Sequence, residues 1–391
     1  MTMTRSRLIL AASAASAALA AVPGIATADA THACDPSPSV AAGQIPTYDD
    51  PYQAYSWEGQ WRSATFTFPS HRTGACLAGT VFAPLDLSAG SPDARFGALR
   101  PAVVIGPGSG PGVEAMYQWS ARDLAGHGYI AVTIDPQGVG HSRTFGNPAC
   151  QVPPPSDPTQ ACPGVPFQQA TNYVDAIQTG LDYLTSAYDP FAGSVDPNEL
   201  GAAGHSLSAR AVSYAQMVDH RIKAIVAWDN LASDLTGDAG SPSGGGVAGQ
   251  LIGGEVPGSS DPITPTVPAL GEASDGRGAD EPTNTDPDLK KTAYEVWRHA
   301  GVPSMEVVFR GSTHSDWAQN NTTTSDTMLH NFEYYTRAWF DRFLLGDTTA
   351  DQRLLAATVN GQPASSIFST NWRSAAFLDG IDCENLVACV K

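Results

Sequence analysis

The sequence has little positive charge: its 391 residues hold 21 Lys and Arg against 39 Asp and Glu, a formal net charge of −18 at pH 7. Because nucleic-acid binding depends on clustered basic side chains, this balance argues against a nucleic-acid partner. Charged residues of both signs make up only 15% of the chain, whereas hydrophobic residues make up 42%. Disordered chains show the opposite balance, so we expect a folded protein.

Motifs for metals and for nucleotide phosphates are missing as well. The sequence has no HExxH motif and no Cys/His cluster of the kind that binds zinc. Its glycine-rich segment Gly106–Gly112 matches neither GxGxxG nor GxxxxGK[ST], the patterns that bind nucleotide phosphates. The acidic stretch 275–288 lacks EF-hand spacing and is interpreted as solvated. We therefore expect no cofactor and no metal ion.

The longest apolar run of the chain lies near its N-terminus. Two arginines precede this run at 8–21, and Ala26–Ala28 has the small-x-small form of a signal cleavage site. We predict a secretory signal peptide over residues 1–28, with cleavage after Ala28 or Ala30. A membrane anchor is the alternative, but the run is short for a bilayer. We expect a secreted, extracellular protein without a stable membrane anchor.

The cysteines fit an oxidising compartment. There are six of them, an even number, and none forms a CxxC pair. Two pairs lie close together in the sequence, which favours local bridges. We predict the disulfides Cys150–Cys162, Cys383–Cys389 and, by elimination, Cys34–Cys76.

Strand-like and helix-like segments alternate along the chain. Apolar strands separated by helices indicate an α/β fold with a mostly parallel central sheet and helices on both faces. We expect one domain over 29–391, with a Gly/Ser/Pro-rich loop insertion at about 230–265. Ligands of such sheets bind beyond the C-terminal strand ends, where functional residues are expected. The predicted strands cover 77–84, 101–105, 129–134, 222–227, 266–270, 305–309 and a short segment ending at 204; the predicted helices cover 116–125, 168–188, 208–218, 289–300 and 328–345.

The pentapeptide Gly204–Ser208, with the sequence GHSLS, lies between a predicted strand and a predicted helix. A strand that turns sharply into a helix presents its middle residue in an exposed, strained position, the arrangement called a nucleophile elbow. We therefore interpret Ser206 as a nucleophile. The usual pattern GxSxG ends in glycine, and Ser208 replaces that glycine by another small residue.

With this motif the chain resembles the α/β-hydrolase family from about Cys76 to Leu345, most closely its secreted cutinase-like polyester hydrolases and dienelactone-hydrolase-like esterases. The resemblance implies a catalytic triad in the chain order Ser, acid, His. The segment Gly311–Trp317 follows a predicted strand and carries His314 where the family has its base. His205, beside the nucleophile, is expected to shape the substrate cleft.

Three carboxylates are candidates for the triad acid. Asp275 follows the predicted strand 266–270 and is our choice for the acid. Asp229 is the rival, because some hydrolases carry the acid one strand earlier. In the polyester hydrolases that the chain resembles, however, a similar Trp-Asp pair lines the substrate cleft, so we expect that role for Trp228 and Asp229. Glu272 is the third candidate, expected to lie within the end of the strand.

A tetrahedral intermediate needs hydrogen-bond donors directed at its oxyanion. The elbow supplies the backbone N–H of Leu207, at the N-terminus of a predicted helix. The segment Pro107–Ser109 matches the place where polyester hydrolases carry the second donor, which here is the N–H of Ser109. A flexible glycine loop is the alternative interpretation of this segment.

These observations predict a secreted, monomeric serine hydrolase that cleaves carboxylic esters through an acyl-enzyme intermediate. Its substrate is expected to be a small-molecule or polymeric ester, since neither the acyl group nor the alcohol follows from the sequence. An amidase, a peptidase or a thioesterase of the same fold is an alternative. A hydrolase-fold binding protein without catalysis is a further alternative, and it predicts a missing or misplaced triad residue.

Overall fold

A computed structural model describes residues 61–390 apart from residues 73, 86, 88–98, 110–111, 138, 144–169, 235–261, 277–285 and 320–323, together with residues 34, 37–38 and 47–48. The predicted signal peptide, the Cys150–Cys162 pair and most of the insertion at 230–265 lie outside the described residues.

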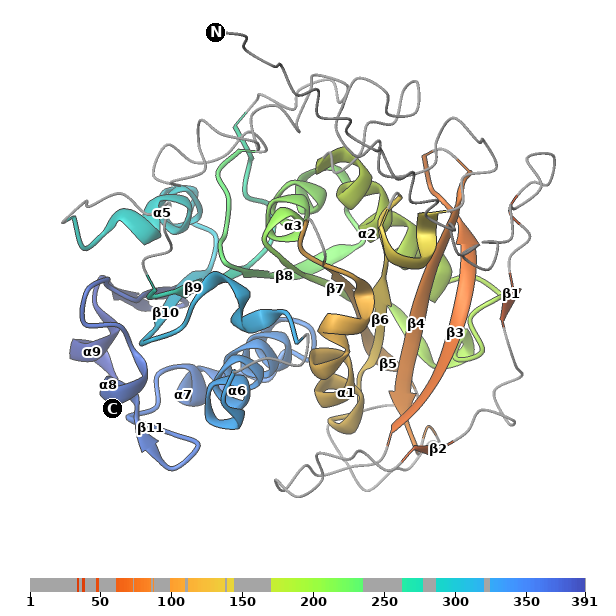
Figure 1. Cartoon of the computed structure of the whole chain (residues 1–391). Helices are drawn as coiled ribbons and strands as arrows, with labels where there is room; N and C mark the ends of the chain where they lie inside the picture. The colour runs from red at the N-terminus through yellow and green to blue at the C-terminus, as the bar shows by residue number, and fades with distance from the viewer. Residues whose placement is uncertain are drawn as a thin grey trace, which may run out of the picture.

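Within the described residues, twelve strands form one mixed sheet. They are β1 (Ser37–Pro38), β2 (Thr47–Tyr48), β3 (Trp61–Pro69), β4 (Cys76–Pro84), β5 (Arg100–Gly106), β6 (Ile130–Ile134), β7 (Val195–His205), β8 (Ile222–Trp228), β9 (Ala269–Ser274), β10 (Ser304–Phe309), β13 (Ala375–Leu378) and β14 (Ile381–Cys383). Their order is β1-β3-β4-β6-β5-β7-β8-β9-β10-β13-β14, with β2 paired to β3 (Figure 1).

The six strands from β6 to β10 in this order are parallel, and antiparallel strands flank them at both edges. Every residue of β5, β6, β9 and β10 is buried, which explains why central strands such as 101–105 are uninterrupted apolar runs. The predicted α/β architecture is confirmed at this level. The outer strand β3, whose burial alternates, was not expected from the sequence.

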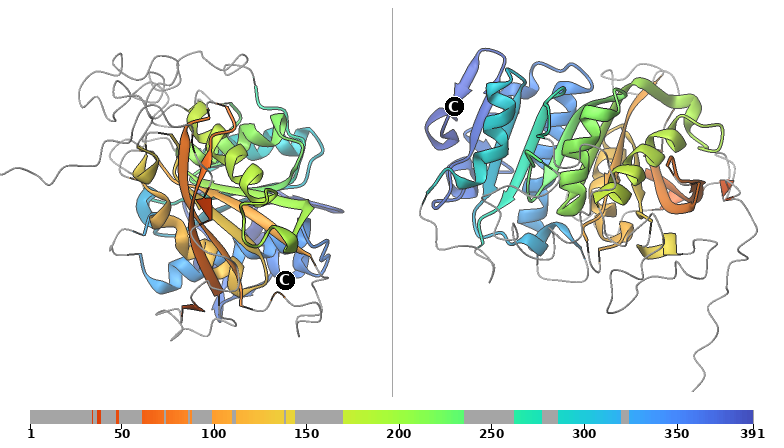
Figure 2. Two further views of the ribbon diagram at one scale, coloured as in Figure 1. Left: turned by 90° about the vertical axis from the view of Figure 1, so that its right-hand side faces the viewer. Right: turned by 90° about the horizontal axis from the view of Figure 1, so that it is seen from above.

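Helices cover both faces of the sheet, as predicted. In Figure 1, α1 and α6 pack on one face, whereas α2, α3 and α5 pack on the other; Figure 2 shows the strong twist of the sheet between its edges. The helices are α1 (Gln118–Gly126), α2 (Ala170–Leu184), α3 (Leu207–Val218), α5 (Thr292–His299), α6 (Asp326–Phe343), α7 (Ala350–Leu354), α8 (Ala364–Ile367) and α9 (Leu386–Cys389). Short 3-10 turns are η3 (Glu114–Tyr117), η4 (Gly140–Arg143), η7 (Ala192–Ser194), η8 (Leu289–Lys291) and η9 (His314–Trp317), and a small hairpin joins β11 (Thr358–Val359) to β12 (Gln362–Pro363).

Two hydrophobic cores lie on opposite faces of the sheet. One contains Leu181 of α2 and Val212 of α3, packed against alternate side chains of the central strands. The other contains Leu124 of α1 and Trp339 of α6. Because the parallel strands are enclosed between these cores, their C-terminal ends are held rigidly at one edge of the sheet.

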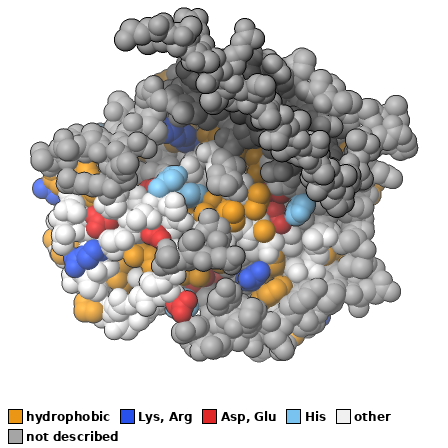
Figure 3. Space-filling view, in the orientation of Figure 1, with side chains coloured by type: hydrophobic (Ala, Val, Ile, Leu, Met, Phe, Trp, Pro, Cys, Tyr) orange, Lys and Arg blue, Asp and Glu red, His pale blue; other side chains and the backbone are white. Residues whose placement is uncertain are grey.

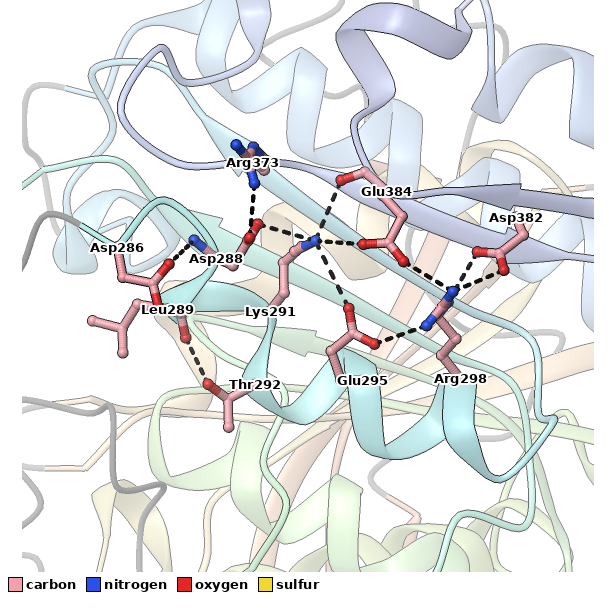
Figure 4. A network of polar contacts seen from close by, with 10 residues as sticks. All are labelled: Asp286, Asp288, Leu289, Lys291, Thr292, Glu295, Arg298, Arg373, Asp382 and Glu384. Atoms are coloured by element: carbon pink, nitrogen blue, oxygen red, sulfur yellow. Dashed lines mark hydrogen bonds and ion pairs between the residues drawn. The ribbon is translucent and has the colours of Figure 1, made fainter.

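The C-terminal part of the chain extends the sheet with β13 and β14 and was not predicted from the sequence. A network of charged residues ties it to α5 (Figure 4). The ammonium group of Lys291, whose side chain is only 2% exposed, lies 3.1 Å from Asp288, 3.7 Å from Glu295 and 3.6 Å from Glu384. The other ion pairs of the network join Arg298 to Glu295, Asp382 and Glu384, and Arg373 to Asp288. A buried ammonium group that loses its carboxylate partners is strongly destabilised. The contacts of Lys291 with Asp288, Glu295 and Glu384 therefore hold the C-terminal segment against α5.

Two of the three predicted disulfides are confirmed: Cys34–Cys76 and Cys383–Cys389. The first attaches the N-terminal segment to β4, and the second closes a loop between β14 and α9. Disulfides persist in oxidising compartments, so the two bridges indicate such a compartment for this chain. Among the described helices, none has the length and apolar character needed to cross a bilayer.

Candidate active site

Ser206 occupies the turn between β7 and α3, at the C-terminal edge of the parallel strands. Its φ of 54° and ψ of −110° are unfavourable for a residue with a side chain. The backbone N–H of Ser206 donates to the carbonyl of Trp228 at 2.8 Å, which fixes this turn to the neighbouring strand. The strained strand-to-helix turn is the geometry expected of a nucleophile elbow.

Ser208 shows how the elbow tolerates serine in place of the usual glycine. Its side chain fills the space beside Gly106 and Gly204: a Cβ on Gly106 would lie 2.4 Å from the Ser208 hydroxyl, and a Cβ on Gly204 would lie 2.5 Å from its Cβ. The hydroxyl donates to the carbonyl of Pro107 at 2.6 Å. Two neighbouring glycines thus make room for Ser208, and its hydroxyl holds the loop that follows β5.

His314 bridges the hydroxyl of Ser206 and the carboxylate of Asp229. Its Nε2 lies 3.0 Å from Ser206 Oγ, and its Nδ1 lies 2.6 Å from Asp229 Oδ2. The turn η9 that carries His314 is stabilised by a capping box between Thr313 and Asp316. The His314 side chain remains 56% exposed, so the imidazole is accessible from solvent.

Asp229 follows β8 directly and is held by the end of β9. Its φ of 45° is a left-handed conformation, which Asp tolerates better than most residues. Its N–H donates to the carbonyl of Glu272 at 2.7 Å. Its carboxylate accepts the backbone N–H of Ser274 at 2.8 Å and the Ser274 hydroxyl at 3.0 Å. These bonds direct the second carboxylate oxygen at the imidazole of His314.

The charges of this pair reinforce each other. Burial alone would raise the pKa of Asp229, but the hydrogen bond and the charge of His314, together with the charge of Lys290, lower that pKa well below its ordinary value. Burial alone would lower the pKa of His314, but the hydrogen bond and the charge of Asp229 raise it. The carboxylate therefore stays ionised at neutral pH and stabilises a protonated imidazole.

The predicted pairing of His314 with Asp275 is wrong: the structure pairs His314 with Asp229. The predicted strand 266–270 is β9, which extends to Ser274, so Asp275 does follow a strand end. Its carboxylate, however, accepts the N–H of Gly311 at 2.9 Å and the hydroxyl of Ser369 at 2.5 Å. Asp275 therefore anchors the loop before His314 to the C-terminal segment and does not contact the imidazole.

Glu272, the third candidate, lies within β9 as expected and is fully buried. Its carboxyl group contacts the hydroxyl of Thr336 at 2.8 Å and the indole N–H of Trp317 at 3.3 Å. Burial raises the pKa of Glu272 to about 8, against the opposing effect of these two donors. Through its contact with Trp317, the last residue of η9, Glu272 holds the turn that carries His314.

Trp228 and His205 do not line an open cleft, which corrects the prediction for both. Trp228 is 0% exposed, and its indole N–H donates to Thr336 at 3.1 Å inside the core. His205 is 4% exposed and contacts the backbone of His314. Asp229, which was expected to line the cleft with Trp228, contacts the imidazole of His314 instead.

The two predicted oxyanion donors lie at neighbouring strand ends. Leu207 is the first residue of α3, where backbone N–H groups have no partner within the helix. Gly106 of β5 pairs with Gly204 of β7, so the loop that carries Ser109 lies beside the elbow. The bond from Ser208 to the Pro107 carbonyl fixes the start of that loop.

Sequence reasoning missed Ser274 and Tyr117, which hold site residues in place. Ser274 binds the carboxylate of Asp229, and the Tyr117 hydroxyl lies 2.8 Å from Nδ1 of His205. A polar residue at the end of an apolar strand was the available signal for Ser274. Nothing in the sequence around Tyr117 indicates its partner, because the two residues are 88 positions apart.

On the face shown in Figure 3, histidine side chains reach the surface beside a patch of hydrophobic side chains. Among the described residues, no group of three or more His, Cys, Asp or Glu side chains is arranged to hold a metal ion.

Comparison with protein-family models gave no match to the chain, and comparison with curated proteins gave none either.

Proposed function

We propose that the protein is a serine hydrolase that cleaves carboxylic esters, with Ser206, His314 and Asp229 as its catalytic triad. The observation that carries this proposal is the hydrogen-bonded chain from Ser206 Oγ to His314 Nε2 at 3.0 Å and from His314 Nδ1 to Asp229 at 2.6 Å. A serine hydroxyl becomes a competent nucleophile when an oriented base takes its proton. Among the described residues, only Ser206 both contacts Nε2 of His314 and occupies a strained turn directly before a helix.

The geometry supports a two-step reaction. Ser206 Oγ attacks the ester carbonyl while His314 Nε2 takes the hydroxyl proton, and the N–H groups of Leu207 and Ser109 bind the oxyanion. His314 then gives that proton to the departing alcohol, which leaves an acyl group on Ser206. Water attacks this acyl-enzyme with His314 again as base, releasing the acid and restoring the serine. Asp229 stabilises the imidazolium in both steps.

The same proposal places the chain in the α/β-hydrolase fold and outside the cell. The triad residues follow the chain order Ser, Asp, His that this fold uses, and the serine sits on a strand-to-helix elbow at the top of a largely parallel sheet. The predicted signal peptide over 1–28 and the two disulfides support secretion. The same triad can also cleave thioesters and amides, which are tested as alternatives.

Labelling with a fluorophosphonate probe tests the nucleophile. We expect the wild type to be labelled, Ser206→Ala to remain unlabelled, and Ser315→Ala, a change at an exposed serine of the His314 turn, to be labelled like the wild type. A folded wild type without labelling favours the non-catalytic alternative, whereas labelling that persists in Ser206→Ala shows that Ser206 is not the labelled nucleophile. Turnover of p-nitrophenyl esters of increasing chain length, polymer films, a thioester and an anilide then defines the substrate class.

A further inference from the structure

His205, directly before the nucleophile, connects three separate parts of the site. Its Nε2 lies 2.8 Å from the backbone carbonyl of His314. Its Nδ1 lies 2.8 Å from the hydroxyl oxygen of Tyr117. That same hydroxyl oxygen accepts the backbone N–H of Gly108 at 3.1 Å, in the loop that presents the N–H of Ser109. The elbow, the base turn and the proposed oxyanion loop therefore share one chain of hydrogen bonds.

Donors and acceptors along this chain allow one arrangement of hydrogens. The His314 carbonyl can only accept, so the hydrogen of a neutral His205 ring must be on Nε2. Nδ1 is then an acceptor, and the Tyr117 hydroxyl must donate to it. The Tyr117 oxygen is left to accept from the N–H of Gly108, as its position allows. Every group of the chain has a partner of the opposite kind.

The surroundings keep both side chains in these protonation states. Burial, and then the charge of His314, lower the pKa of His205 to about 3, against the opposing charge of Asp229, so its ring is neutral at ordinary pH. Burial raises the pKa of Tyr117, which keeps its hydroxyl protonated.

The parts fit closely around the His205 ring. The rings of His205 and His314 have centroids 4.7 Å apart, and the Trp317 ring stacks on His205 with centroids 6.0 Å apart. On the other side, a Cβ at Gly108 would lie 2.8 Å from Nδ1 of His205 and 3.0 Å from the Tyr117 hydroxyl. The backbone of the loop after β5 thus packs directly on the hydrogen-bonded pair.

We propose that His205 is a positioning residue whose neutral ring, with its hydrogen on Nε2, holds the His314 turn and, through Tyr117, the loop that carries Ser109 in fixed positions relative to Ser206. This inference rests on the proposed function. A base and oxyanion donors that shift by about 1 Å can lose on the order of 100-fold in rate, so one side chain that fixes both has a direct effect on turnover.

The hydrogen position can be measured without any assay of activity. Long-range ¹H–¹⁵N NMR of histidine-labelled protein distinguishes the two neutral forms and the protonated ring, and the His205 signals are those that disappear in His205→Gln. We expect a neutral ring with hydrogen on Nε2 from pH 5 to 9. A hydrogen on Nδ1, or a protonated ring in this range, overturns the proposal. In Tyr117→Phe, which removes the donor to Nδ1, we expect the Nδ1 signal to move.

Two substitutions separate the two roles of the ring, because Asn and Gln place their polar atoms near the positions of Nδ1 and Nε2. His205→Asn keeps an acceptor for Tyr117 but lacks the donor to the His314 carbonyl. His205→Gln keeps that donor but lacks the acceptor. We expect each to lower kcat for a p-nitrophenyl ester by about 10- to 100-fold with KM nearly unchanged. Asn and Gln at the exposed His220 are the matched controls and should retain wild-type kcat.

Combining substitutions tests whether Tyr117 acts through His205. Tyr117→Phe alone should lower kcat, whereas Tyr117→Phe added to His205→Gln should lower it little further, because their shared bond is already lost. Tyr188→Phe, at an exposed tyrosine, is the control. Full additivity, or wild-type kcat in folded His205 variants of an active enzyme, overturns the positioning role. A wild type that hydrolyses no ester defeats the proposed function instead, and the NMR result still decides where the hydrogen lies.

Discussion

Asp229 and Asp275 follow neighbouring parallel strands, β8 and β9, and both carboxylates are largely buried at the same edge of the sheet, yet their partners differ completely. Asp229 accepts the backbone N–H of Ser274 with Oδ1 and the Ser274 hydroxyl with both oxygens, and its Oδ2 also contacts Nδ1 of His314. The carboxylate of Asp275 accepts hydrogen bonds from three donors, none of which is on His314: the N–H of Gly311, the hydroxyl of Ser369 and the side-chain amide of Asn371.

The difference originates at the end of β9, where Ser274 and Asp275 are adjacent. Successive residues of an extended chain point in opposite directions. Ser274 therefore faces Asp229, whereas Asp275 faces the segment that contains Ser369. One carboxylate contacts the imidazole of His314, which is partly exposed to solvent, and the other joins the loop before His314 to the C-terminal part of the chain. Position after a strand is thus insufficient to assign a triad acid.

The strongest test of this comparison exchanges each carboxylate for its amide. Asp229→Asn should lower kcat by roughly 10⁴-fold, because an amide cannot hold the imidazole in the required tautomer or stabilise its charge. Asp275→Asn should lower kcat less than tenfold but reduce the free energy of unfolding by about 1–3 kcal/mol, since buried donors lose an acceptor. Ester turnover and urea denaturation measure the two effects.

The comparison fails if Asp275→Asn, shown to be folded, loses as much turnover as Asp229→Asn. An equally small loss of kcat in both variants would instead show that the carboxylate of Asp229 contributes little to the reaction.

A third carboxylate, Glu272, extends the comparison to a group that is neutral. Burial raises its pKa to about 8 in the folded protein, above the ordinary value of about 4.3 that an unfolded chain has. The stability that Glu272 contributes is therefore fully present below about pH 4 and is lost as pH rises through 8. Each unit of pKa shift corresponds to about 1.4 kcal/mol, so the loss is on the order of a few kcal/mol.

Glu272→Gln cannot ionise and should remove this part of the pH dependence. The free energy of unfolding, measured by denaturant at pH 5 and pH 9, should fall less over this range in the variant than in the wild type. Buried Asp135 and Asp189, whose pKa values burial raises to about 6 and about 7, contribute equally to both proteins. An equal fall in wild type and variant would show that Glu272 is ionised in the fold at neutral pH.

The pH dependence of turnover tests the link between Asp229 and His314. The free enzyme needs a neutral imidazole, so kcat/KM should rise with pH through the pKa of His314, which Asp229 raises above its ordinary 6.5. In Asp229→Asn the remaining influences, burial and the charges of Lys290 and Arg210, all lower that pKa. The midpoint of the residual activity should move down by about 1–3 pH units. The same midpoint in both proteins would contradict the pairing.

The layered α/β architecture was predictable from the sequence, because buried parallel strands such as β5 must be continuous apolar runs. The turn around Ser206 and the position of His314 after β10 followed from local patterns as well. These features depend on residues that are close in the sequence, or on the rule that parallel strands end at one edge.

The carboxylate that contacts His314 could not be chosen from the sequence, because the choice depends on contacts between distant segments. Asp275 is held by Ser369, 94 positions away, in a C-terminal region whose place beside β10 no pattern indicated. The predicted end of β9 fell at Leu270, four residues before its actual end at Ser274. With the longer strand, Ser274 would have been recognised as a polar neighbour of the residue that follows β8.

The smallest effect that separates the two carboxylates comes from their serine partners. Ser274→Ala removes a hydroxyl that donates to ionised Asp229, and hydrogen bonds to charged groups contribute roughly 1.5–3 kcal/mol. The backbone N–H of Ser274 still binds the carboxylate, so we expect only about a tenfold loss of kcat. Ser369→Ala, the matched change beside Asp275, should keep kcat within about twofold while lowering the free energy of unfolding by about 1 kcal/mol. Loss of turnover in Ser369→Ala without loss of stability would mean that the carboxylate of Asp275 acts on the reaction through the loop before His314.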